Sequence, residues 1–177
     1  MKARTALALA ATALVLGTGI GWAAKTATGP GIDVLRGLPP TEAAAKALAA
    51  AETLAGKGSW ELIAVGRVHY LGGDKAHGQA IFDRVTSGKP EGSDWQRIGE
   101  VYAASGDNAK AEECFQKALA LNPKDDTGQA EVGTWYIRNG QREKGEELLG
   151  RALARNPDTV WHYVRAAEAY LKVPEGR

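Results

Sequence analysis

The sequence of 177 residues has little of what holds many small exported domains together: one cysteine, one methionine and two phenylalanines. A single cysteine, Cys114, excludes an intramolecular disulfide and a cysteine-rich metal site. The scarcity of phenylalanine and methionine beside abundant alanine and 22 glycines favours closely packed helices over a β-sandwich. The length predicts one domain with a short appendage.

An excess of one charge sign is also missing, because 22 lysines and arginines face 21 acidic residues for a net charge of +1. No overall field therefore recruits nucleic acid or an anionic membrane surface, and we expect no nucleic-acid partner. Aromatic and basic residues alternate over 161–165. We assign them to packing of a terminal helix, which also accounts for Tyr163, rather than to base stacking.

Charge is absent from Thr5 to Ala24, directly after the basic head formed by Lys2 and Arg4. This pattern predicts that residues 1–24 are a signal peptide, cut after Ala23, or an uncleaved membrane anchor, and cleavage is favoured. Either reading predicts export, with the rest of the chain periplasmic or anchored at the inner membrane outside the cytoplasm. Residues 25–40 carry scattered glycine and proline and are predicted to be a linker.

The chain repeats itself with a period of 34 residues. Five pairs share this spacing: Gly99 and Gly133, Tyr102 and Tyr136, Gly106 and Gly140, Ala118 and Ala152, Pro123 and Pro157. Periods of this size are typical of repeat architectures in which stacked units share one continuous core. With Trp95, Ile98, Ala111 and Phe115, the pattern resembles the tetratricopeptide repeat (TPR) family.

The resemblance implies an all-α, right-handed solenoid of about three TPR helix-turn-helix repeats plus a C-terminal capping helix. The expected segments are a capping helix or half-repeat at 41–56 with Thr41 as its N-cap, a degenerate repeat at 59–91, repeats at 92–125 and 126–159, and a cap helix at 160–172.

The side-chain sizes and backbone preferences of the repeated residues support a helix-turn-helix repeat. Small Gly66, Gly99 and Gly133 let the two helices of a repeat approach closely, against large neighbours such as Phe115. Left-handed glycines close the first helices at Gly73, Gly106 and Gly140, and Asp74 and Asp107 can cap the second helices. Proline after Asn122 and Asn156 ends those second helices.

In TPR proteins the first helix of each repeat faces a concave groove that binds a partner. Carried over to this chain, the partner-binding residues are Trp60, Ile63, Arg67, Tyr70, Leu71, Gln96, Arg97, Glu100, Glu131 and Arg138. Ile63 and Arg67 stand where chaperone-binding members place a carboxylate-gripping pair, so that binding mode is not expected.

Trp60, Ile63, Tyr70 and Leu71, flanked by Arg67 and Arg97, combine aromatic anchors with arginine as protein-binding hot spots do. The alternative reading is that Trp60 and Tyr70 pack on the alanine-rich helix at 41–54.

Catalysis has little support. His69, His77 and His162 fall in different helices, and no nucleophile or carboxylate pair has a recognised spacing beside them. His69 occupies an aromatic packing position, and His77 and His162 are expected on the surface. We therefore predict no enzyme activity, no cofactor and no metal. The expected function is a non-catalytic scaffold that holds a partner peptide or helix, in assembly of an envelope complex. The alternative is a membrane-anchored structural accessory subunit of a larger membrane complex.

Overall fold

The structure is a computed structural model that describes residues 29–173. Within this range the chain forms eight α-helices, one short 3₁₀ helix at Ile32–Val34, and no strand. The helices are α1 (Pro40–Ala55), α2 (Ser59–Leu71), α3 (Lys75–Thr86), α4 (Gly92–Ala104), α5 (Asn108–Leu121), α6 (Asp126–Arg138), α7 (Arg142–Arg155) and α8 (Val160–Leu171). The predicted all-α class is confirmed. The predicted signal or anchor at 1–24 lies outside the described residues.

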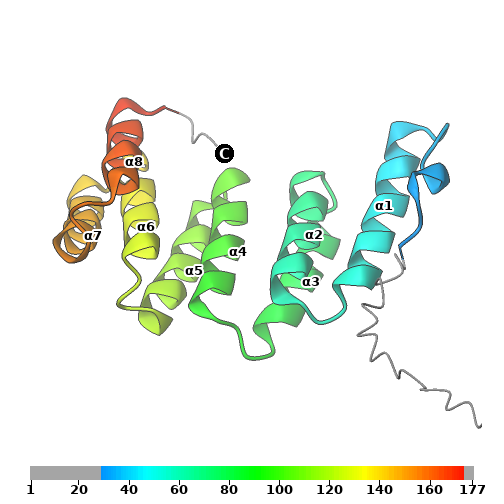
Figure 1. Cartoon of the computed structure of the whole chain (residues 1–177), viewed down its shortest axis with the longest axis horizontal. Coiled ribbons are helices and arrows are strands. Elements are labelled where there is room, and N and C mark those ends of the chain that lie inside the picture. The colour runs from blue at the N-terminus through cyan, green and yellow to red at the C-terminus, as the bar shows by residue number, and fades with distance from the viewer. Residues whose placement is uncertain (1–28, 174–177) are drawn as a thin grey trace, which may run out of the picture.

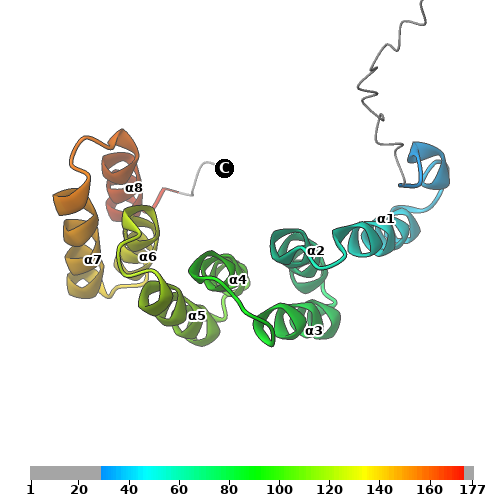
Figure 2. The same cartoon turned by 60° about the horizontal axis from the view of Figure 1, so that its bottom comes forward.

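The helices stack as successive hairpins. Helix α2 pairs with α3, α4 with α5, and α6 with α7, while α8 packs mainly on α6 (Figure 1). The stack curves, with α2, α4, α6 and α8 along the inner side of the arc and α3, α5 and α7 along the outer side (Figure 2). This arrangement is the TPR-like α-solenoid that the repeat predicts.

The turn between the two helices of a hairpin follows the predicted chemistry. Gly106 has φ +81°, a left-handed conformation that closes α4, and the Asp107 carboxylate accepts a hydrogen bond from the Lys110 backbone N–H at 3.4 Å. The α2–α3 turn repeats this with a left-handed Gly73 and with Asp74, which accepts from the His77 N–H at 3.1 Å. The turns therefore recur in phase along the stack.

Glycine meets a large ring where the two helices of a hairpin cross. A Cβ atom on Gly99 would lie 2.7 Å from Cε1 of Phe115, and one on Gly66 would lie 2.6 Å from Cε1 of Phe82. In the third hairpin Gly145 stands where the second has Ala111, and a Cβ there would lie 2.4 Å from the Gly133 carbonyl oxygen. In the α6–α7 hairpin, two glycines, Gly133 and Gly145, therefore face each other where the helices cross.

The core runs through the stack as interlocking aromatic rings. The Tyr102 ring lies 5.4 Å from that of Tyr70 and 5.8 Å from that of Phe82, both edge-on. The Tyr102 hydroxyl donates to Oε1 of Gln79 at 2.8 Å, and burial raises the pKa of this phenol to about 12. Contacts between neighbouring hairpins thus bury apolar side chains that a single hairpin would leave exposed to solvent.

Helix α1 is attached more loosely. No residue of α1, all of which the structure describes, is buried, and Leu48, Ala51 and Ala55 pack half-buried against the core. The prediction that Thr41 caps this helix is wrong. The helix begins with Pro40 as its first residue, because proline has the φ of a helical start and needs no hydrogen bond there.

No helix in the range 29–173 is long and apolar enough to cross a membrane.

Candidate binding groove

A groove of about 1010 Å³ is lined mainly by α2, α4, α6 and α8. These helices lie along the inner side of the arc (Figure 2). Nine of the ten predicted partner-binding residues line the groove: Trp60, Ile63, Arg67, Leu71, Gln96, Arg97, Glu100, Glu131 and Arg138. The spacing places these residues on one face of each first helix, since positions three and four apart on a helix are neighbours.

Tyr70 is the exception, and its placement in the groove was wrong. Its side chain is 4% exposed and lies against the rings of Phe82 and Tyr102 inside the core. The reason is helical phase. Tyr70 follows Gly66 by four residues and shares its face toward α3, whereas Leu71 follows Arg67 by four and shares the groove face.

Trp60 marks the N-terminal end of the groove. Its side chain is 52% exposed, and the guanidinium carbon of Arg97 lies 3.7 Å from its ring centroid. This cation–π contact joins α2 to α4 and holds the indole at the groove. Ile63 is buried beside it and forms part of the floor.

Polar and charged side chains interact across the middle of the groove. The Gln96 amide on α4 donates to the Glu131 carboxylate on α6, and Arg165 on α8 lies 2.6 Å from the other oxygen of that carboxylate. Farther along, Arg138 on α6 and Glu168 on α8 approach to 3.9 Å. These pairs join the inner helices and set the positions of their polar groups.

Helix α8 supplies the C-terminal end of the groove, which the sequence analysis missed. Trp161 is 66% exposed and Val164 is 40% exposed, and both line the groove with Arg165. Because we expected α8 to be a cap helix, the predicted groove positions did not extend to it. Adding 34 to Thr127 and Glu131, which line the groove on α6, gives Trp161 and Arg165, so the period itself was the overlooked signal.

Two further expectations about α8 were wrong. His162 is 1% exposed rather than on the surface; its Nε2 lies 3.4 Å from a carboxylate oxygen of Asp126, and its Nδ1 has no hydrogen-bond partner among the described residues. Tyr163 is 52% exposed, so packing does not account for it. Successive residues of a helix are rotated by about 100°, so the neighbours His162 and Tyr163 differ in burial.

Cys114 is buried in α5, and burial raises the pKa of its thiol to about 11. A thiol in that state is a poor nucleophile at neutral pH, because the thiolate is the reactive form.

A family model described as "Tetratricopeptide repeat" matches residues 93–125. Among solved structures, one titled "Crystal structure of MamA" is similar to this chain with a TM-score of 0.55 at 16% identity, over 75% of this chain and 80% of that one. At that identity the likeness shows the fold alone. No curated protein matches the sequence. The matched repeat and the hairpins stacked on both sides of it give the described residues a TPR-like α-solenoid fold.

Proposed function

We propose that the protein is a non-catalytic scaffold outside the cytoplasm, where it holds a peptide or helix of a partner protein in the concave groove during assembly of an envelope complex. The observation that carries this proposal is a pair of exposed tryptophans, Trp60 and Trp161, on the first and last inner helices of one continuous groove. Isolated exposed apolar residues are common, but aromatic side chains in a concave site are typical binding anchors.

The groove between the tryptophans suits an apolar segment that carries some acidic residues. Four arginines and three glutamates line it: Arg67, Arg97, Arg138, Arg165, Glu100, Glu131 and Glu168. Glu131 and Glu168 already approach arginines of the groove. The cost of removing water from these charges when a partner binds is therefore reduced. The inner helices are rigid, so the entropy cost of ordering the receptor is low.

Site-specific photo-crosslinking tests the proposal. Ala104 on α4 lines the groove, and Ala120 on α5 is exposed on an outer helix, so a photoreactive phenylalanine analogue replaces the same small residue at both positions. We expect the groove position to crosslink one partner in native cells and the outer position to crosslink little of it. Equal crosslinking of the same partner from both positions would contradict groove binding.

The proposed location is supported by the uncharged run from Thr5 to Ala24 after a basic head. Mass spectrometry of the mature N-terminus tests it: export with cleavage predicts a chain that begins at Ala24 and is released by osmotic shock. Recovery of Met1 in a carbonate-resistant membrane fraction would instead favour the alternative function, an anchored structural subunit of a membrane complex. An uncut chain in the cytoplasmic fraction would contradict both.

A further inference from the structure

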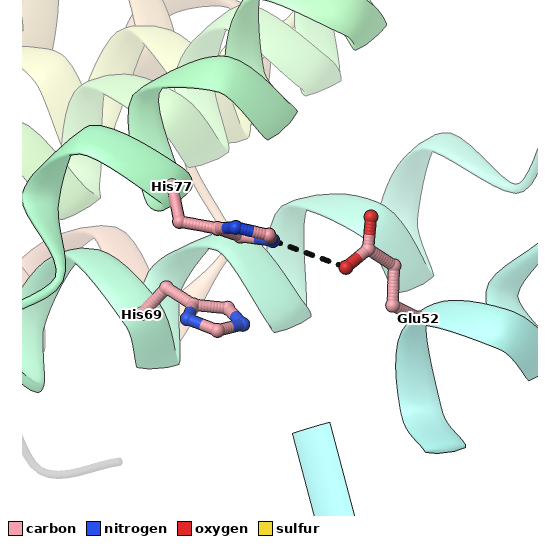
Figure 3. A group of neighbouring side chains, drawn as sticks. All are labelled: Glu52, His69 and His77. Carbon is pink, nitrogen blue, oxygen red and sulfur yellow. Dashed lines mark hydrogen bonds and ion pairs between the residues drawn. The ribbon is translucent and has the colours of Figure 1, made fainter. Parts of the chain in front are cut away.

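Three side chains from three helices meet beside the first hairpin: Glu52 of α1, His69 of α2 and His77 of α3 (Figure 3). One ligand atom from each lies within 4.8 Å of the other two. We propose that these residues bind a divalent transition-metal ion of the Zn²⁺ class, which fastens α1 to the α2–α3 hairpin.

The three groups already converge on one another. The rings of His69 and His77 lie one above the other, with centroids 4.2 Å apart and planes inclined by 33° (Figure 3). Nε2 of His77 lies 3.1 Å from a carboxylate oxygen of Glu52. Nδ1 of His69 lies 3.7 Å from the Asp74 carboxylate, which leaves its Nε2 as the ligand atom.

The donor set selects the kind of ion. Two imidazoles and one carboxylate suit Zn²⁺, Ni²⁺ or Cu²⁺, whereas Ca²⁺ and Mg²⁺ take oxygen ligands. Zn²⁺ binds such ligands tetrahedrally at roughly 2.0–2.2 Å, so two ligand atoms of one ion lie about 3.4 Å apart. From separations within 4.8 Å, the ligand atoms therefore approach one another by up to roughly 1.4 Å on binding. Glu52 and His77, with side chains 25% and 45% exposed, have room to rotate, and water completes the coordination.

Neighbouring charges orient two of the ligands. Arg84 of α3 lies 3.1 Å from the second carboxylate oxygen of Glu52, and Asp74 faces the ring nitrogen of His69 that points away from the site. Metal-binding carboxylates and histidines usually have such outer partners, which fix their orientation.

The position gives the ion a structural role. Helix α1 has no buried residue within the described chain, so half-buried alanine and leucine contacts hold it on α2. A metal bridge from Glu52 to the two histidines adds a crosslink between α1 and both helices of the first hairpin. We expected no metal because the histidines fall in different helices and no carboxylate pair of recognised spacing stands beside them.

Calorimetric titration of the untagged full chain with Zn²⁺ tests the proposal. We expect one ion per chain, and at least tenfold weaker binding for each of Glu52→Gln, His69→Gln and His77→Gln at unchanged helicity. Glu42→Gln is the matched control, because it removes an ion pair within α1 but keeps the three ligands and their outer partners, and its affinity should stay within about threefold of the wild type. Absence of one-to-one binding, or a His69→Gln/His77→Gln double variant that binds like the wild type, would overturn the proposal.

A measurement on the unaltered chain keeps the test independent of how the variants fold. The sequence has three histidines, and His162 on α8 lies at the other end of the solenoid (Figure 1). On addition of paramagnetic Co²⁺, the imidazole resonances of His69 and His77 should shift or broaden together at one equivalent, while those of His162 stay in place. An equal response of all three histidines would rule out the site.

Discussion

At the scale of single residues, the space beside each glycine determines how closely the helices of a repeat approach. A Cβ atom on Gly99 would lie 2.7 Å from Phe115 and 3.2 Å from Cβ of Cys114. Gly150 lies on the exposed side of α7. A Cβ atom added there would have no heavy atom of the described residues within 4 Å, apart from its chain neighbours and the backbone of its own helix. The same residue type therefore has opposite consequences at the two positions.

We predict that Gly99→Ala destabilises the protein by about 1–3 kcal/mol, since the added methyl group forces the Phe115 ring and α5 outward. Gly150→Ala should stabilise it by roughly 0.5–1 kcal/mol, because alanine has the higher helix propensity and nothing obstructs it. Denaturant unfolding of both variants measures the two changes. A change of the same sign in both would contradict the packing of this hairpin.

Single residues also show where reasoning from sequence succeeds. Gly99, Gly106 and Phe115 were placed correctly because the 34-residue period and the size of each side chain agree on their roles. Tyr70 was misplaced because its aromatic character suggested a binding anchor, while its spacing from Gly66 already put it in the core. His162 was misplaced because polarity alone suggested the surface, although its neighbour Trp161 takes the exposed position.

At the scale of helices, one carboxylate joins the last two hairpins. Glu112 on α5 lies 2.6 Å from the Lys144 ammonium on α7 and accepts a hydrogen bond from the Tyr136 hydroxyl on α6 at 3.3 Å. The hydrogen bond from Lys144 lowers the pKa of Glu112 below its ordinary 4.5. A lowered folded-state pKa means that the carboxylate stabilises the fold above pH 4.5, and that this contribution is lost as the pH falls further and the group is protonated.

We predict that Glu112→Gln lowers the free energy of unfolding at pH 7 by roughly 0.2–1 kcal/mol, the usual range for an exposed ion pair. The difference from the wild type should shrink below pH 4.5 and vanish once Glu112 is protonated in both folded and unfolded chains. Glu147→Gln is the control, because Glu147 pairs with Arg151 within α7 and joins no second helix. Denaturant unfolding at pH 7 and pH 2 measures both variants, and a Glu112→Gln difference independent of pH would contradict the electrostatic origin.

Whole helices were easier to predict than their ends and their faces. The left-handed glycines and the Asn-Pro pairs mark the ends of α4, α5 and α7 within a residue or two, because their backbone requirements are local. The start of α1 was less clear, since Pro40 and Thr41 are both good helix starters. Helix α8 was predicted only as a cap, because the 34-residue period, which gives its groove residues Trp161 and Arg165, was not extended to it.

At the scale of the whole molecule, the curvature of the stack brings the inner helices of successive repeats together along one continuous concave surface. The inner helices α2, α4, α6 and α8 present corresponding faces to one concave side (Figure 2). The period was enough to predict this row of helices and nine of its residues. The partner was not predictable, because side chains on the groove face can vary without altering the packing that holds the solenoid together.

The affinity of the crosslinked partner for three single-aromatic variants tests the central claim, that the groove is the binding surface. Trp60 and Trp161 line the groove, whereas Tyr163 is as exposed as Trp60, at 52%, but lies on α8 outside the groove lining. We predict that Trp60→Ala and Trp161→Ala each weaken binding about tenfold or more, as loss of an anchor does, with helicity unchanged. Tyr163→Ala should bind like the wild type. Full affinity in both tryptophan variants, or an equal loss in Tyr163→Ala, would contradict the claim.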